Sequence, residues 1–425
     1  MRVSETLIAG GLSALALCVM APAANATEGY FQSGYSAVQQ ALAGSGVANP
    51  EDAMTLANNP AGLTAVGHEI EGGISLFSPI RQYTVSGGPG FVAPGDVRSG
   101  NNDFPIPNFA YSQPIDSVSA WGVAVSANGG LNTSYGSGVV NPACGPGSGV
   151  FCGGKAGVSL NQVLISAGYS RDVGNWSFGV APIVAVQMFY ADGLVAFSRA
   201  SASPGNLTNR GADWSYGGGG RVGAIWHVSK AFRLAFSGTT PILMTKFNRY
   251  SGLFADGGSF NIPATITAGA AFDVSTTLTV MADYKRIFYS DIAAVGRSSA
   301  FTGQPFGSAG GPGFGWSDVN IISIGAEWRA APRLTLRAGY EHNTNPIGPA
   351  DVTLNILAPG VTTDAIAGGG SYRFNAHSSL DLAATYVPQN TVSGIEVTPQ
   401  GPNPGRTISL SMHQFDLTVG YRYQF

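Results

Sequence analysis

The last twelve residues of the chain, QFDLTVGYRYQF (414–425), alternate between apolar and polar or small side chains. Every second residue from Phe415 to Phe425 is large and apolar. A period of two is the signature of a β-strand with one apolar face and one polar face. The segments ISIGAEWR (322–329) and RLTLRAGYE (333–341) repeat the pattern, so we expect a run of similar strands.

The connections between these strands alternate between short and long. Only Ala330–Pro332 joins the two segments just quoted, and Gly174-Asn175 forms another short connection. Strands of about ten residues with short turns at one end and long loops at the other are typical of outer-membrane barrels. The long loops are predicted at Ser86–Pro107, Gly129–Gln162, Ala191–Gly219, Gly296–Asn320 and Pro388–Thr407.

Composition strengthens the membrane interpretation. Asp, Glu, Lys and Arg make up 11% of the 425 residues, against about 25% in soluble domains. No apolar run of 18 residues follows the first 26, which excludes helical spans and leaves a closed barrel as the remaining way to satisfy the backbone in lipid. The net charge of -3 argues against nucleic-acid binding.

The first 26 residues read as a secretory signal. Arg2 precedes an apolar run, and Ala24-Asn25-Ala26 forms the cleavage motif, so the mature chain is predicted to begin at Thr27. Cys18 lies in the apolar run after Leu17, whereas lipid attachment favours a small residue at that position. The exported chain keeps Cys144 and Cys152, which bracket a Gly-rich loop and predict a disulfide. A metal site is disfavoured because no His or acidic residue accompanies them, and no cofactor is predicted.

Residues 27–66 lack the period of two. SAVQQALAGSG and EDAMTLANN are each compatible with a short helix, and the stretch ANNPAGL (57–63) then closes the segment. Forty residues of mainly small and polar side chains cannot form an independent domain. The sequence therefore predicts three parts, which are a signal at 1–26, an enclosed segment at 27–66 and an all-β, transmembrane antiparallel barrel at 67–425.

Residues 27–66 resemble the plug, or hatch, of the FadL/TodX-type outer-membrane transporters of long-chain fatty acids and hydrocarbons. The similarity includes Asn59-Pro60-Ala61-Gly62-Leu63 and the preceding residues Gly34, Ala41, Gly44, Ala48, Asp52 and Ala53. It implies a barrel of about 14 strands that encloses residues 27–66. Asn59, Pro60, Ala61 and Gly62 would anchor the plug to the first strand, and the gate would comprise Thr27, Glu28, Gly29, Tyr30 and Phe31.

The resemblance also implies a route for the cargo. The ligand would be captured among the long loops, reach an apolar pocket beside the mature N-terminus and leave sideways into the membrane. The segment Trp121–Gly130 is the candidate for the break in the wall. Loop aromatics such as Phe151 and Trp316 suit the capture of an apolar molecule, although packing of loop against loop explains them equally well. Among the basic residues on inward positions, Lys285, Arg333, Arg337 and Arg373 are candidates to hold a ligand carboxylate, or alternatively to form ion pairs within the barrel.

The predicted partners follow from this assignment. They are a hydrophobic small molecule, outer-membrane lipid of a Gram-negative cell, and the barrel assembly machinery, which would read Tyr421, Tyr423 and Phe425 at the C-terminus. The resemblance implies a monomer. A general diffusion porin or a structural outer-membrane barrel is the alternative. An enzyme is disfavoured because the five histidines are scattered outside any hydrolase or metalloprotease motif.

Overall fold

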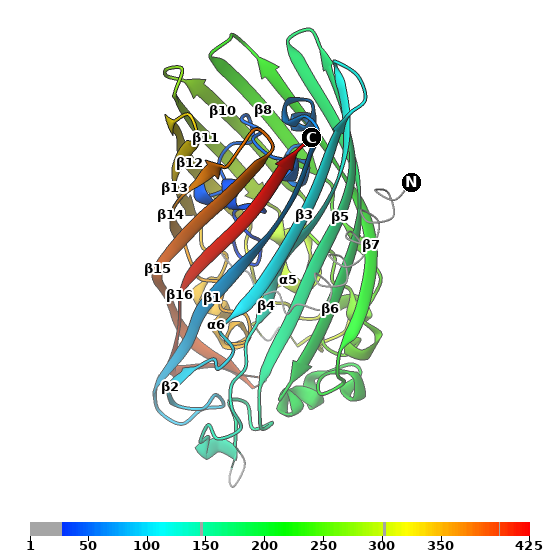
Figure 1. Ribbon diagram of the computed structural model, residues 1–425. Helices are drawn as coiled ribbons and strands as arrows, with labels where there is room; N and C mark the ends of the chain where they lie inside the picture. The colour runs from blue at the N-terminus through cyan, green and yellow to red at the C-terminus, as the bar shows by residue number, and fades with distance from the viewer. Residues whose placement is uncertain (1–27, 145–147, 301–302, 399) are drawn as a thin grey trace.

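Each long strand pairs with its antiparallel neighbour, and the last strand pairs with the first, so the sheet closes into a barrel (Figure 1). The structure is a computed structural model that describes residues 28–144, 148–300, 303–398 and 400–425. The predicted signal at 1–26, with Cys18, and the predicted first mature residue Thr27 lie outside the described residues.

In the described part of the chain the sheet has 16 strands. Two of them, β2 (Gly95–Arg98) and β9 (Leu243–Met244), are short additions to β1 and β7, and fourteen remain as the wall. This confirms the predicted strand number. The wall strands are β1 (Glu69–Gly87), β3 (Phe104–Pro114), β4 (Ser119–Asn132), β5 (Gly157–Val173), β6 (Trp176–Asp192), β7 (Asp213–His227), β8 (Phe232–Thr239), β10 (Thr265–Asp273), β11 (Leu278–Ile287), β12 (Val319–Ala331), β13 (Leu334–Asn343), β14 (Asp364–Arg373), β15 (Ser378–Thr398) and β16 (Gly401–Gln424).

The alternation read from the sequence matches the two faces of the wall. On β16, Phe415, Leu417 and Tyr421 are exposed on the outside, whereas Gln414 and Thr418 are buried inside. The same alternation on the other strands covers the outside with aliphatic and aromatic side chains. A barrel whose outer face is apolar is suited to lipid contact.

Four of the predicted loops, all but Gly296–Asn320, are shorter than the sequence suggested. The clearest case is Pro388–Thr407, because β15 and β16 continue through it as a long hairpin, and Ser393 and Ser409 hydrogen-bond across it at 2.7 Å. Likewise β5 begins at Gly157 and β7 at Asp213. Prolines, glycines and small polar residues suggested loops at these positions. In the structure, hairpins extend beyond the rest of the wall, and backbone pairing between their two strands tolerates these residues.

The helices are all short. No helix in the described part of the chain combines the length and hydropathy needed to cross a membrane. The α-helices are α2 (Ala37–Ala41), α3 (Leu63–Val66), α4 (Ala255–Gly258), α5 (Ala293–Gly296) and α6 (Val352–Asn355). The 3-10 helices are η1 (Ala53–Ala57), η2 (Pro60–Gly62), η3 (Pro142–Cys144), η4 (Val195–Ala200), η5 (Pro204–Asn206), η6 (Asn248–Tyr250), η7 (Tyr289–Asp291) and η8 (Pro349–Asp351).

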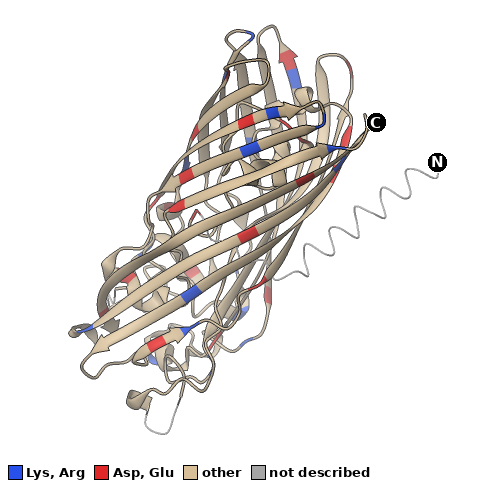
Figure 2. Cartoon of the chain, turned by 60° about the vertical axis from the view of Figure 1, so that its left-hand side comes forward, with Lys and Arg blue, Asp and Glu red and all other residues tan. Residues whose placement is uncertain are grey.

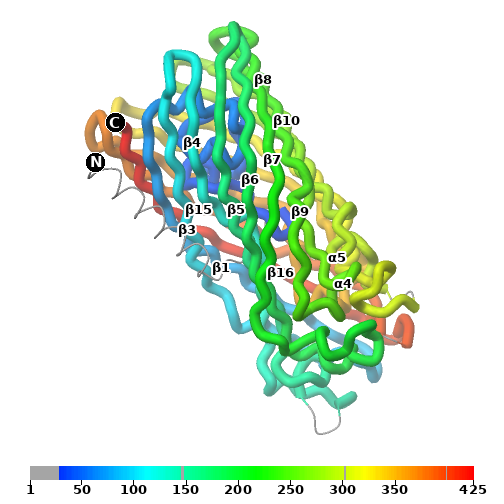
Figure 3. The backbone as a smooth tube through the Cα atoms, turned by 90° about the vertical axis from the view of Figure 1, so that its right-hand side faces the viewer, coloured from blue at the N-terminus to red at the C-terminus, as the bar shows by residue number. Residues whose placement is uncertain are grey.

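Residues 28–66 lie inside the barrel, as the blue segment in Figure 3 shows. Helix α2 contacts β13 to β16, while η1, η2 and α3 contact strands on the other side of the lumen. Helix α2 begins at Ser36, whose hydroxyl accepts from the Gln39 amide and donates to Asp52 at 2.6 Å. Small residues allow the close packing, since a Cβ on Gly369 would lie 2.8 Å from the Cβ of Ala41. The Ala- and Gly-rich composition is thus explained by enclosure in the barrel.

Candidate functional site

The first described residues lie against the inner face of β4. The Gly130 amide donates to the Tyr30 carbonyl at 3.0 Å, and Phe31 forms an isolated bridge with Gly129. The Gln32 side-chain amide donates to the Ala127 carbonyl at 2.9 Å. Residues 28–32, which we call the N-terminal segment, are therefore bonded directly to one point of the wall.

That point is a bulge. Ala127 pairs with Val163 and Gly129 pairs with Gln162, so Asn128 is an extra residue in β4. The pairing of β3 with β4 also ends here, because the last pair toward the long loops is Phe109 with Val125. Strand β3 continues along β1 and β4 continues along β5, so the two strands separate toward the long-loop end. The separation lies beside the predicted segment Trp121–Gly130.

Apolar side chains occupy the place where the two strands separate. Phe77, Phe104, Ile106 and Ala127 form a buried cluster there. Beyond Phe109, the described residues show no backbone pairing between β3 and β4, so side chains rather than a hydrogen-bonded ladder close this part of the wall. Side-chain packing can open by rotamer changes, whereas a ladder cannot.

An aromatic cluster surrounds the N-terminal segment. The Tyr30 ring lies 5.0 Å from the Tyr289 ring and 5.9 Å from the Trp316 ring, centroid to centroid. The Tyr289 hydroxyl donates to the Glu28 carbonyl at 2.7 Å and accepts from the Tyr30 amide at 3.1 Å. Burial raises the pKa of both tyrosines, so they stay neutral hydrogen-bonding groups.

One ion pair joins the N-terminal segment to the wall. The Lys285 ammonium on β11 pairs with the carboxylate of Glu28, whose side chain is only 2% exposed. Burial raises the pKa of the Glu28 carboxyl, and the positive charge of Lys285 opposes that rise. The Lys285 ammonium also lies 6.0 Å from the centre of the Phe31 ring. Lys285 is thus the one candidate basic residue beside the N-terminal segment.

Two narrow cavities flank the N-terminal segment. The first is lined by Phe31, Lys285 and Arg221, together with the apolar residues Leu164, Ile242 and Ile262. Arg221 was missed in the sequence analysis; it is buried and donates to the Thr239 hydroxyl at 2.9 Å and the Leu56 carbonyl at 3.2 Å. The period-two alternation on β7 could have identified it as an inward cation.

The second cavity lies beside the bulge and is lined by Phe77, Gly130, Leu131, Met412 and Gly360. A Cβ on Gly360 would lie 3.1 Å from the Gly29 carbonyl oxygen, and Gly130 bonds to Tyr30. Residues Gly29 to Phe31 therefore separate the first cavity from the second, which adjoins the apolar cluster between β3 and β4.

The Asn-Pro-Ala-Gly turn packs against β6 and β7, not against the first strand as the sequence analysis expected. A Cβ on Gly179 would lie 2.3 Å from the Ala61 nitrogen, and one on Gly223 would lie 1.9 Å from the Asn59 side-chain oxygen. The Asn59 side chain accepts from the Ala61 amide and donates to the Val47 carbonyl, both at 3.1 Å. Proximity to β1 in sequence misled the prediction, because wall glycines far along the chain form the receiving surface.

The four basic residues proposed from the sequence do not form one site. Arg337 is buried at the short-turn end, where it donates to Glu327 at 2.8 Å and to Glu51 at 3.3 Å. Arg333 and Arg373 line a cavity at the same end. Figure 2 shows blue and red segments on the strands near the end that carries the C-terminus. Lys285 alone lies beside the N-terminal segment.

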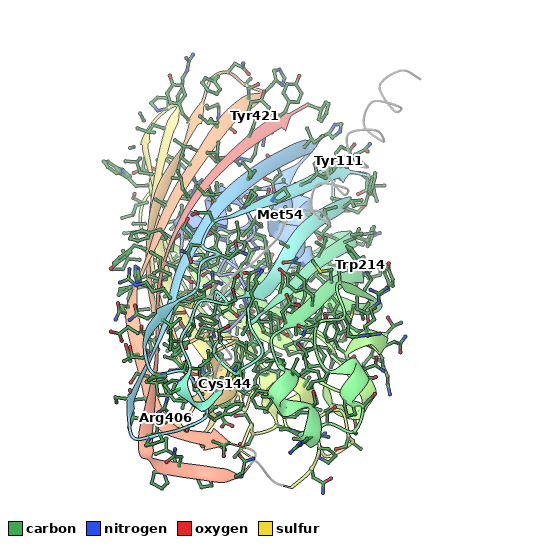
Figure 4. The ribbon with its side chains drawn as sticks, turned by 90° about the horizontal axis from the view of Figure 1, so that it is seen from below. Met54, Tyr111, Cys144, Trp214, Arg406 and Tyr421 are labelled. Carbon is green, nitrogen blue, oxygen red and sulfur yellow. A yellow bond between two sulfur atoms is a disulfide. The ribbon has the colours of Figure 1, made fainter. Side chains whose placement is uncertain are left out.

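The long loops contain most of the aromatic side chains noted in the sequence. Phe151, Phe197, Phe306 and Trp316 are buried with their neighbours in one large apolar cluster, so packing of loop against loop accounts for them. Trp214 lies instead on β7, where its side chain is exposed (Figure 4). A disulfide joins Cys144 and Cys152 and closes the tip of one long loop.

The C-terminal residues lie at the seam of the barrel. Tyr421 and Phe425 face outward, and the Phe425 ring stacks on His68 with 4.1 Å between centroids. The Tyr423 ring stacks on His377 at 5.8 Å. This aromatic end forms a surface that lipid can contact.

Known structures share the architecture. The toluene transporter TodX of P. putida aligns over 93% of this chain and 99% of its own, with 18% identity and a TM-score of 0.67. A FadL homologue of Pseudomonas aeruginosa gives 14% identity over 93% of this chain and 100% of its own, with a TM-score of 0.67. The toluene transporter TbuX of Ralstonia pickettii gives 19% identity over 93% and 99%, with a TM-score of 0.60. A comparison with curated proteins gave no match.

The family comparison covers nearly the whole chain. The profile of the outer membrane protein transport proteins (OMPP1/FadL/TodX) matches residues 16–425. This places the protein in the outer membrane of a Gram-negative bacterium and among transport proteins rather than enzymes. The chain belongs to the OMPP1/FadL/TodX family of outer-membrane transport proteins.

Proposed function

We propose that this protein takes up hydrophobic small molecules, such as monoaromatic hydrocarbons or long-chain fatty acids, and releases them sideways into the outer membrane. The observation that carries the proposal is the bonding of residues 30–32 to the bulge at Asn128, next to the place where β3 and β4 stop pairing. One movement of the N-terminal segment would both join the two cavities and free the bulge.

The side chains in the long-loop half of the lumen favour an apolar cargo. The first cavity has both polar and apolar lining residues, whereas the rest of the long-loop half of the lumen is filled by the large apolar cluster. An apolar molecule that enters there replaces side-chain contacts of the same kind and needs no desolvation of charges. A hydrophilic solute that entered the large apolar cluster would have to leave water without gaining hydrogen bonds in return.

Lys285 provides a means of gating. While the Glu28 carboxylate is paired with the Lys285 ammonium, the N-terminal segment stays in place. A ligand carboxylate that replaces Glu28 would form an equivalent ion pair and would release the segment. A neutral hydrocarbon would instead act by displacing Phe31 from the apolar wall. The two classes thus open the same gate through different contacts.

The test is uptake of labelled oleate and labelled toluene by cells that carry the protein as their sole transporter of this type. Deleting Asn128 restores an uninterrupted register between β4 and β5, and uptake of both compounds is expected to fall to background. Deleting Gly138, an exposed residue of a long loop, serves as the matched control and should leave uptake within about twofold. Unchanged uptake without Asn128 would contradict lateral release.

Extraction and mass spectrometry of the purified protein identify the natural ligand.

The porin alternative predicts a different electrical result. A porin conducts ions as purified, whereas a lumen filled by residues 28–66 should conduct little. Planar-bilayer recordings of the intact protein separate the two functions, because a steady porin-like conductance would contradict the proposal.

A further inference from the structure

The end of the lumen with the short turns contains a cavity of about 360 Å³ that the transport route does not use. We call residues 28–66 as a whole the interior segment. The cavity lies between Glu51 of the interior segment and the ends of β12, β13 and β14. The volume falls in the range of small-molecule sites, about 300 to 1,000 Å³. Its lining is polar and charged, so it cannot belong to the apolar path at the long-loop end.

The lining carries an excess of positive charge. Five arginines and three glutamates face the cavity, which gives a formal charge of +2 with His377 neutral. The arginines are Arg329, Arg333, Arg337, Arg373 and Arg422, and the glutamates are Glu51, Glu69 and Glu327. The excess matters because the protein as a whole has a net charge of -3.

The floor of the cavity is already paired. Arg337 donates to Glu327, Glu51 and the Ser371 hydroxyl. Arg422 makes two hydrogen bonds to Asp381, at 2.7 and 2.9 Å. These bonds use most of the carboxylates of the floor, and of the arginines nearer the mouth only Arg329 has an acidic partner among the described residues.

Two arginines at the mouth are unpaired. Both residues are exposed to solvent, and among the described residues neither the Arg333 nor the Arg373 guanidinium has a hydrogen-bond or ion-pair partner within 4 Å. The Arg373 amide donates to the Arg333 carbonyl at 2.9 Å, so the two residues are neighbours on adjacent strands. Arg329 adds a third positive charge nearby, although it is ion-paired with Glu327 at 3.6 Å, a carboxylate that Arg337 shares.

Like charges on adjacent strands repel each other, and an anion between them removes the repulsion. Each guanidinium can present two parallel N–H groups to a carboxylate or phosphate. We propose that this cavity, which we call the basic vestibule, binds a small soluble anion with at least two negative charges, such as phosphate or a di- or tricarboxylate. Arg333 and Arg373 hold the anion, and Arg329 contributes long-range attraction.

The site does not depend on the proposed uptake function. It faces the short-turn side, beyond the interior segment, and its ligand is hydrophilic. The cavity also adjoins the contact between Arg337 and Glu51 of the interior segment.

The test is isothermal titration calorimetry on the full-length protein in detergent, at low ionic strength, with citrate, inorganic phosphate and acetate. Citrate is expected to bind saturably at one site with a dissociation constant in the millimolar range or tighter, and acetate about tenfold more weakly. The double variant Arg333→Gln/Arg373→Gln should weaken citrate binding about tenfold or more. Arg98→Gln, an exposed arginine on β2 at the opposite end, is the matched control and should bind as the wild type does.

Arg373→Lys keeps the charge but loses the paired N–H geometry, so an intermediate affinity is expected. The heat-dependent shift of barrel mobility in gel electrophoresis verifies that each variant is folded. Absence of saturable citrate binding would overturn the proposal, as would equal binding by the double variant. Binding of a polyglutamate peptide without binding of citrate or phosphate would also overturn it, in favour of a macromolecular partner.

Discussion

The two halves of the lumen differ in chemistry although one wall encloses both. The long-loop half contains the large apolar cluster, in which Tyr30, Tyr289 and Trp316 are buried together. The short-turn half contains buried ion pairs that join the interior segment to the wall, such as Arg337 with Glu51. The N-terminal segment lies at the boundary.

The difference explains why the path we propose turns sideways. An apolar molecule can enter the long-loop half without disturbing a charge, but going straight on would require it to break buried ion pairs. Breaking such a pair by removing one partner costs about 3 to 5 kcal/mol. The weakly closed region between β3 and β4 is hydrogen-bonded to the N-terminal segment. Among the described residues, moving that segment disturbs one ion pair, Glu28 with Lys285, whereas the straight path crosses the several pairs of the short-turn half.

Removal of residues 28–66 is expected to have the largest effect on the difference between the two halves of the lumen. The lumen then loses both the ion-paired layer and the N-terminal segment, and single-channel conductance in planar bilayers is expected to rise by about tenfold or more. The deletion of Asn128, which keeps the interior segment, is the control and should leave conductance low. Equal conductance with and without residues 28–66 would show that another part of the chain blocks the lumen.

A smaller change removes the ion pair at the boundary. Lys285→Met leaves the Glu28 carboxylate buried without a partner, and it should destabilise the seated N-terminal segment by about 3 to 5 kcal/mol. Limited proteolysis of residues 28–32 measures this as faster cleavage. The double variant Glu28→Gln/Lys285→Met removes both charges and should recover most of the protection. Slow cleavage of the single variant would mean that the aromatic contacts alone hold the segment.

A third change weakens the anchor of the interior segment without touching a charge. Gly179→Ala places a Cβ against the Pro60–Ala61 backbone, and overpacking of this kind costs about 1 to 3 kcal/mol. More frequent transient openings are expected in bilayer recordings. Gly368→Ala, where the nearest atom lies 3.7 Å from the new Cβ, is the matched control and should behave as the wild type does.

The smallest effect on transport is expected from the loop disulfide. Cys144→Ser/Cys152→Ser should lower the stability of that loop by about 2 to 3 kcal/mol, as estimated from the eight-residue separation. Uptake of labelled toluene should change less than about twofold, because no described residue of the loop tip lines either cavity. A large loss of uptake would indicate that this loop belongs to the capture surface.

Much of the fold could be predicted because alternation is a local property. The pattern in residues 414–425 identified β16 and its two faces, and similar patterns identified other wall strands, whereas the number of about 14 was implied by the family resemblance. The composition of residues 27–66 showed that this segment could not stand alone. Loop boundaries were harder to predict, because the Pro- and Gly-rich sequence of residues 388–407 is compatible with either a loop or a paired hairpin.

The candidate site was less predictable, because it depends on contacts between distant residues. The sequence suggested four basic residues for one role, yet Lys285 lies beside the N-terminal segment and Arg333, Arg337 and Arg373 lie at the opposite end. Arg221 was missed because no local pattern distinguishes an inward arginine near a cavity from any other inward residue.

The sequence by itself determined the closed antiparallel barrel, its lipid-facing side and the presence of a segment that needs enclosure. These depend on residue period and composition, which a chain carries without folding. Only the tertiary structure decided that Asn59 to Gly62 pack on β6 and β7, that β3 and β4 separate at Asn128, and that Glu28 meets Lys285. These features depend on strand register and on which glycines leave room, and both are set by pairing around the whole barrel.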